Sequence, residues 1–170
     1  MPLELGDRPD PPTSGAEKEM LTGFLDFHRA TLLWKCTGVS DADLRRSTVP
    51  SGTCLLGLVK HLAFVEQWWF RVAFGGDEPT APPPWTDDDP DADFRVEPDE
   101  TTEQILDLYR LMCEQSREVV AAASLDDQAA IEGHGHRSLR WILLHMVEET
   151  ARHNGHADII REQIDGATGE

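Results

Sequence analysis

The pattern of apolar and polar positions divides the chain into four helical segments separated by stretches rich in proline and glycine. In each segment apolar side chains recur every three or four residues, the period of an α-helix with one buried face. The four segments span residues 17–35, 51–76, 102–124 and 138–166. A shorter turn is expected between the first two segments, in the stretch Val-Ser-Asp-Ala-Asp-Leu.

Start and stop signals set the predicted ends of these helices. The second helix begins at a Ser/Thr cap near Ser51 and ends at Gly75-Gly76, and Thr102 is the predicted cap of the third helix. The fourth opens near Ser138 and runs to a stop at Gly166. Four helices of about 20 residues without a clear strand pattern predict an all-α fold, an antiparallel four-helix bundle.

The predicted bundle forms a single domain with two irregular parts. Residues 1–16 are expected to be an irregular N-terminal segment, and residues 17–166 the bundle domain. Residues 76–98 form a long acidic connection, rich in proline, between the second and third helices. Long loops in small domains are usually functional or mobile, and composition does not decide whether this one covers a cavity or only links two helices.

Composition and charge exclude several classes of protein. The formal net charge of −17 would repel a nucleic acid, and no apolar run is long enough to span a membrane. No basic and then apolar signal sequence is visible at the N-terminus, so we expect a cytoplasmic protein. The chain has three cysteines, far apart and without a Cys-x-x-Cys pair, which argues against a disulfide framework and a cysteine zinc site.

The fourth segment carries an unusual stripe of titratable residues. His145, Glu149, His153 and His156 fall within a sector about 80° wide on a helix. Such a stripe is an ordinary polar face if it meets water. The same sector, however, contains the apolar residues Ile142, Met146, Ile160 and Ile164, whereas polar residues such as Asn154 and Asp158 fall elsewhere. The pattern therefore predicts that the quartet faces the core.

A second polar residue lies on an apolar helix face. His61 in the second segment is flanked at helical spacing by Leu58, Leu62, Val65, Trp68, Trp69 and Val72. A single histidine in such a position is more often a hydrogen-bonded core residue than a metal ligand. Buried imidazoles and a carboxylate nevertheless need compensation, by pairing, hydrogen bonds or a cation.

A divalent metal ion is the economical compensation. Glu149 and His153 are four residues apart, so both can reach one ion, and His61 is the expected third ligand across the bundle. Two imidazoles and a carboxylate suit zinc or nickel, and also iron. Alternatively, His145 or His156 completes the ligand set or orients a ligand through its other ring nitrogen.

Three further residues are candidates for the wall of a ligand pocket. Trp68 and Trp69 are large enough to line one, although tryptophan at helical spacing is more often part of the core. His28 in the first segment is expected either to line the cavity or to have a capping or solvent-exposed role.

The two histidine-bearing segments resemble a known superfamily. "LVKHLAFVE" in the second helix together with "EETARHNGH" in the last is similar to the DinB/YfiT-like superfamily, and within it to the DinB-like domain family DUF664. That superfamily also includes mycothiol-dependent maleylpyruvate isomerase and bacillithiol-linked transferases. The resemblance implies a four-helix bundle with a metal held by His61 and by the pair Glu149 and His153. Many relatives have histidine where this chain has Glu149, and glutamine where it has His156.

The resemblance also implies a function. It favours a divalent-metal protein that acts as a transferase or isomerase, with mycothiol or a related small thiol as cofactor and a small electrophile as substrate. A metal-dependent hydrolase and a non-enzymatic protein that binds a metal or small ligand stay open as alternatives. Relatives in this superfamily often dimerise, so the resemblance allows a homodimer, and the sequence leaves the oligomeric state open.

Overall fold

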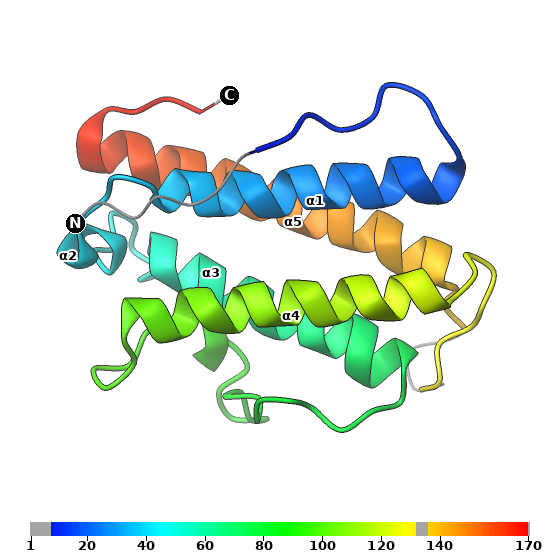
Figure 1. Cartoon of the computed structure of the whole chain (residues 1–170). Helices are drawn as coiled ribbons and strands as arrows, with labels where there is room; N and C mark the ends of the chain where they lie inside the picture. The colour runs from blue at the N-terminus through cyan, green and yellow to red at the C-terminus, as the bar shows by residue number, and fades with distance from the viewer. Residues whose placement is uncertain (1–7, 132–135, 170) are drawn as a thin grey trace.

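The structure, a computed structural model, describes residues 8–131 and 136–169, and it is helical (Figure 1). Of the predicted irregular segment 1–16, residues 1–7 lie outside the described residues. No β-strand occurs within these two ranges, so the predicted all-α fold is confirmed. The helices are α1 (Glu17–Cys36), α2 (Asp41–Leu44), α3 (Leu55–Glu66), the π-helix η1 (Gln67–Phe74), the 3₁₀ helix η2 (Ala92–Phe94), α4 (Thr102–Ala122) and α5 (Leu139–Asp165).

The long helices pack in two pairs, α1 with α5 and α3 with α4. The colours of Figure 1 show that α1 and α5 run in one direction and that α3, η1 and α4 run in the other. Helices next to each other along the chain are therefore antiparallel except α3 and α4. Because those two are parallel, the chain must return along the bundle between them. This geometry explains the long connection at residues 75–101.

The helix ends follow the predicted signals, with two corrections. The cap of α3 is Cys54, whose sulfur accepts a hydrogen bond from the Gly57 N–H, and not an upstream serine or threonine. The cap of α4 is Thr101, one residue before the predicted position, and it forms a capping box with Gln104. The side chain of Ser138 caps α5 as expected, and α5 ends at Gly166 in the left-handed conformation.

The second predicted helix changes character after Glu66. From Gln67 onward it continues as the π-helix η1, in which Gly75 N–H donates to the Phe70 carbonyl. A π-turn holds more residues than an α-turn, so side chains beyond Glu66 are rotated relative to the expected face. The predicted apolar face is thus correct at Leu58 and Leu62, which are buried, and wrong farther on, where Phe70 is buried and Val72 is only half-buried.

The core is made of two apolar clusters. One joins α3, α4 and the ends of α1 and α5 and includes Leu32, Leu55, Leu58, Leu62, Tyr109 and Ile160. The other joins η1 to the opposite end of α1 and the start of α5 and includes Leu25, Phe70, Leu139, Ile142 and Met146. All three cysteines are free and buried, and burial raises the pKa of the Cys36 and Cys113 thiols to about 12. None of the described helices is long and apolar enough to cross a membrane.

Candidate metal centre

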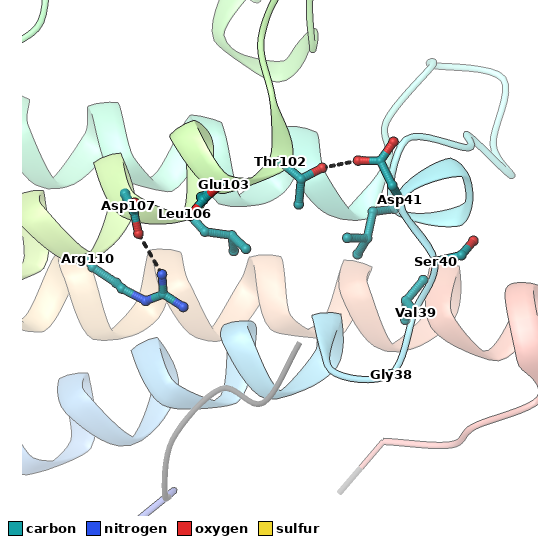
Figure 2. Close-up of a pocket in the computed structure, with 10 residues that line it drawn as sticks. Gly38, Val39, Ser40, Asp41, Thr102, Glu103, Leu106, Asp107 and Arg110 are labelled. Carbon is teal, nitrogen blue, oxygen red and sulfur yellow. Dashed lines mark hydrogen bonds and ion pairs between the residues drawn. The ribbon is translucent and has the colours of Figure 1, made fainter. Parts of the chain in front are cut away.

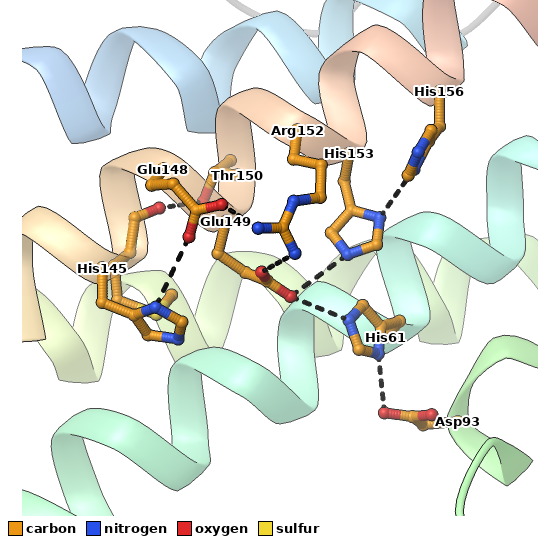
Figure 3. Close-up of polar contacts among 10 residues, drawn as sticks. His61, Asp93, His145, Glu148, Glu149, Thr150, Arg152, His153 and His156 are labelled. Carbon is orange, nitrogen blue, oxygen red and sulfur yellow. Dashed lines mark hydrogen bonds and ion pairs between the residues drawn. The ribbon is translucent and has the colours of Figure 1, made fainter.

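Two helices bring the three predicted ligand side chains together (Figure 3). Glu149 and His153 lie one turn apart on α5, and His61 reaches them from α3. One donor atom from each side chain lies within 4.8 Å of the other two. The four-residue spacing accounts for the α5 pair, and the packing of α3 on α5 accounts for the third member. We call His61, Glu149 and His153 the triad.

A single carboxylate oxygen lies between the two imidazoles of the triad. Oε1 of Glu149 is 3.2 Å from Nε2 of His153 and 3.6 Å from Nε2 of His61. The hydrogen bond with His153, assisted by His61, holds the pKa of the Glu149 carboxyl well below its usual range. The carboxylate is therefore ionised at neutral pH, the state in which it binds cations.

The opposite edge of the His61 ring is held by the connection between η1 and α4. Nδ1 of His61 shares a 2.8 Å hydrogen bond with Oδ2 of Asp93, and the Phe94 ring stacks on the imidazole with centroids 3.8 Å apart. Burial opposes protonation of His61, but the neighbouring carboxylates of Asp93 and Glu149 outweigh it and raise the pKa of His61. Asp93 thus fixes the ring so that Nε2 points toward Glu149.

Gly57 lets this connection approach α3 closely. It lies one helical turn before His61, and a Cβ atom placed on it would be 2.2 Å from the carbonyl oxygen of Phe94. Any side chain at Gly57 would therefore push η2 away from the helix, and Asp93 and Phe94 with it.

His145 and His156, the alternative ligands, lie outside the group of three donor atoms. The ring of His145 stacks on Trp141, and its Nδ1 faces Glu148 at 3.6 Å. His156 is exposed, and its Nδ1 lies 3.3 Å from Nδ1 of His153, on the side of that ring away from Glu149. In this arrangement His156 can orient His153, whereas the contacts of His145 among the described residues are with Trp69, Trp141 and Glu148 and not with the triad.

The prediction that the whole quartet faces the core is wrong in part. His153 is buried, His145 and Glu149 are half-buried, and His156 is exposed. Asn154, which was expected on another face, is buried and donates to the His28 carbonyl at 3.0 Å. The buried face of α5 is therefore rotated toward α1, and the quartet lies along its edge, where ligands from solvent can reach it.

The candidate pocket residues separate into two places. Trp68 and Trp69 line a cavity of about 310 Å³ together with His61 and Asp93. His28 instead lies where α1 meets α5, and it does not line this cavity. Its Nδ1 is buried without a hydrogen-bond partner among the described residues, and burial lowers the pKa of His28.

A larger cavity of about 760 Å³ lies at the end of the bundle, between α2 and the start of α4 (Figure 2). Its walls include Asp41, Thr102, Asp107 and Arg110, and none of the triad residues lines it. The size of a cavity therefore does not identify the candidate metal centre, because this larger cavity is not lined by the triad, the only group of histidine, cysteine and acidic side chains with metal-binding geometry among the described residues.

Sequence reasoning missed Asp93 and Phe94. Both lie in the acidic connection, where Asp93 is one of many aspartates in "DDDPDADF". The one available signal is the Ala92-Asp93-Phe94 stretch, in which apolar residues interrupt an otherwise polar run. In the structure this stretch is η2, with Ala92 and Asp93 buried against α3.

The donor atoms of the triad and their surroundings fit a divalent metal ion. Nε2 of His61 is buried and has no hydrogen-bond partner among the described residues. A buried nitrogen without a hydrogen bond is costly, yet Asp93 holds this one facing an ionised carboxylate and a second imidazole. Two imidazole nitrogens and a carboxylate oxygen are donors that zinc, nickel and iron accept.

Comparison with known proteins identifies a family. The family model described as mycothiol S-transferase matches residues 20–166, which include both helices of the triad and the connection that carries Asp93. No curated protein matches the chain. Because the matched segment covers most of the sequence, the chain belongs to the mycothiol S-transferase family, a DinB-like family.

Proposed function

We propose that this protein is a metal-dependent thiol S-transferase that uses mycothiol as its thiol and a small electrophile as its second substrate. The family supports the transferase class and the thiol. The observation that carries the metal requirement is the buried Nε2 of His61, which has no hydrogen-bond partner among the described residues and faces Glu149 and His153.

His61, Glu149 and His153 would hold the ion, with zinc or nickel fitting the donor set best and iron as a third candidate. Three protein ligands leave coordination positions open, as in catalytic rather than structural sites. When bound, a divalent cation supplies a positive charge that lowers the pKa of a thiol and favours its thiolate.

The residues around the triad prepare the site for this chemistry. Asp93 and Phe94 fix the His61 ring, and His156 contacts the outer nitrogen of His153. In the overall reaction the thiol loses its proton to solvent and the thiol sulfur forms a bond to an electrophilic carbon. In a substitution, the bond between that carbon and a leaving group breaks, and the leaving group departs with the electron pair. In an addition, a π bond of the electrophile breaks instead, and its electron pair takes up a proton from solvent. Because Glu149 is half-buried, this event would occur at the edge of the bundle, open to both substrates.

The test combines metal analysis with a conjugation assay. Purified protein should contain about one equivalent of divalent metal and conjugate mycothiol to monochlorobimane, and the His153→Ala variant should lose both properties. Wild-type protein without stoichiometric metal, or a His153→Ala variant that keeps full activity, would contradict the proposal. Metal-containing protein that hydrolyses test esters and forms no thiol conjugate would favour a hydrolase, and metal without either activity a binding protein.

A further inference from the structure

Two cavities open beside the triad, one on each histidine. The first, of about 310 Å³, reaches His61, and the second, of about 340 Å³, reaches His153 and His156. The ring of Phe94 lines both, and no other residue is common to the two linings. The centroid of the Phe94 ring lies 3.8 Å from that of His61 and 5.7 Å from that of His153. Phe94 therefore separates the two cavities, with one histidine of the triad on each side.

The cavity at His61, which we call the tryptophan cavity, has aromatic and acidic walls. Three indole rings line it, Trp68 and Trp69 from η1 and Trp85 from the connection, together with the carboxylates of Asp91 and Asp93. Its described lining contains no lysine or arginine. Flat aromatic faces beside carboxylate acceptors suit a neutral ligand with many hydroxyl groups, because the rings stack on the C–H face of a sugar and the carboxylates accept its O–H groups.

The connection holds Trp85 in place without a ligand. The side-chain amide of Gln67 makes two 2.8 Å hydrogen bonds with the backbone of Ala81, and the Trp85 ring packs edge-on against Phe64 at 5.8 Å. The wall is therefore preformed, and binding there does not have to order the loop.

The cavity at His153, the apolar cavity, has a different chemistry. It is lined by Val49, Leu58, Ile159 and Ile160, with hydroxyls only at Ser51 and Thr53. Burial of carbon surface dominates binding to such a wall, which suits an apolar molecule.

We infer that the two cavities divide the two substrates: the glycoside part of mycothiol binds in the tryptophan cavity, and an apolar electrophile binds in the apolar cavity. This inference rests on the proposed function. Mycothiol is an N-acetylcysteine joined by an amide to a glucosamine–inositol glycoside, so apart from its thiol it is a neutral polyol. With the glycoside on the His61 side and the electrophile on the His153 side, the sulfur and the reacting carbon meet at the triad.

The same walls explain selection among thiols. Glutathione carries two carboxylates and a net negative charge, and Asp91 and Asp93 would repel it in the tryptophan cavity. A neutral thiol of similar size pays no such cost. The cavity therefore selects by charge as well as by stacking, and the net charge of −17 on the whole chain acts in the same direction.

The first experiment measures binding of the cysteine-free glycoside, N-acetylglucosaminyl-inositol, by calorimetry. This probe has no thiol, so its binding does not depend on activity. Trp85→Ala should weaken it about tenfold, the loss expected when one stacking ring is removed, and Trp85→Phe should weaken it less. Trp34→Ala is the matched control, since Trp34 is an exposed tryptophan on α1 that lines neither cavity, and it should leave the affinity unchanged.

The second experiment changes the apolar cavity and compares the effect on the two substrates. Ile159 is exposed enough for Ile159→Ser to fold normally, and this variant should raise KM for an apolar electrophile severalfold while leaving glycoside affinity at the wild-type value. Asp91→Asn should raise the affinity for glutathione. The inference is overturned if Ile159→Ser lowers the affinity for the glycoside and Trp85→Ala does not. It is also overturned if the wild-type protein does not bind the glycoside. Loss of the proposed function looks different, because protein without metal or conjugating activity can still bind the glycoside and respond to Trp85→Ala.

Discussion

The bundle contains two clusters of charged side chains, and they differ in how completely their hydrogen bonds are satisfied. In the first, Arg29 on α1 donates to both carboxylate oxygens of Glu66 on α3, at 2.7 and 2.5 Å, and to Asp26 at 2.9 Å. Each guanidinium nitrogen therefore has a partner. In the second cluster, the triad, Nε2 of His61 has none among the described residues.

The more deeply buried of the two clusters is the one whose hydrogen bonds are complete, so depth of burial alone does not identify the candidate functional cluster. Glu66, which belongs to the first cluster, is 1% exposed, whereas the side chain of His61 in the triad is 13% exposed. The two residues are only five positions apart on α3. The bidentate pair of Arg29 and Glu66 is complete in itself. In the triad, the buried His61 nitrogen lies 3.6 Å from an ionised carboxylate without a hydrogen bond, an arrangement that a cation between them would complete.

The largest effect should follow from removing Arg29 from its cluster with Glu66 and Asp26. Arg29→Met removes one partner and leaves the Glu66 carboxyl group buried without it, which should lower the free energy of unfolding by about 3–5 kcal/mol in chemical denaturation. Arg110→Met is the control, because Arg110 pairs with Asp107 at the surface and its loss should cost less than about 1 kcal/mol. Equal losses in the two variants would show that the Arg29 pair is not a special element of stability.

Removing the metal should have the next largest effect, and only where the triad is intact. With metal at 100 times its Kd, the wild-type protein gains about 2.7 kcal/mol of stability, and a chelator should remove this gain. His153→Ala should unfold at the same midpoint with and without chelator. A chelator effect that persists in His153→Ala would place the metal elsewhere in the protein.

Loss of the hydrogen bond between His61 and Asp93 should have a smaller effect, measured as metal affinity. Asp93→Asn keeps the size of the side chain but removes the charge that fixes the His61 ring, so affinity should fall about 10- to 100-fold in competition with a chelating dye. Asp91→Asn, two residues away and exposed, should leave metal affinity unchanged. If the two variants behave alike, the 2.8 Å contact between Asp93 and His61 has no role in holding the ligand.

Periodic spacing predicted the parts of the site that lie on regular helices. Glu149 and His153 are four residues apart on one helix, so any α-helix brings them together, and the capping residue Ser138 and the stop at Gly166 fix the extent of that helix. The pairing with His61 required a second helix with a histidine on a buried face. That inference needed no knowledge of helix direction.

Irregular geometry could not be predicted in the same way. The position of Asp93 depends on a connection that follows the length of the bundle, and no local periodicity encodes that path. The shift from α-helix to π-helix after Glu66 also rotates the side chains that follow, so the predicted buried face was wrong beyond that residue. Gly57 was the neglected signal, since a glycine inside an apolar helix often marks the close approach of another backbone.

The smallest effect should come from Arg152, which offers a direct comparison with Arg29 because both arginines pair with a glutamate. The side chain of Arg152 is 57% exposed, and it pairs with Glu148 and, at 3.5 Å, with Oε2 of Glu149. Arg152→Ala should therefore lower the free energy of unfolding by less than about 1 kcal/mol. It also removes a positive charge beside a predicted ligand, so divalent-metal affinity should rise slightly in the same dye competition. A fall in affinity would instead mean that Arg152 holds Glu149 in its binding position, which would make the exposed pair part of the site.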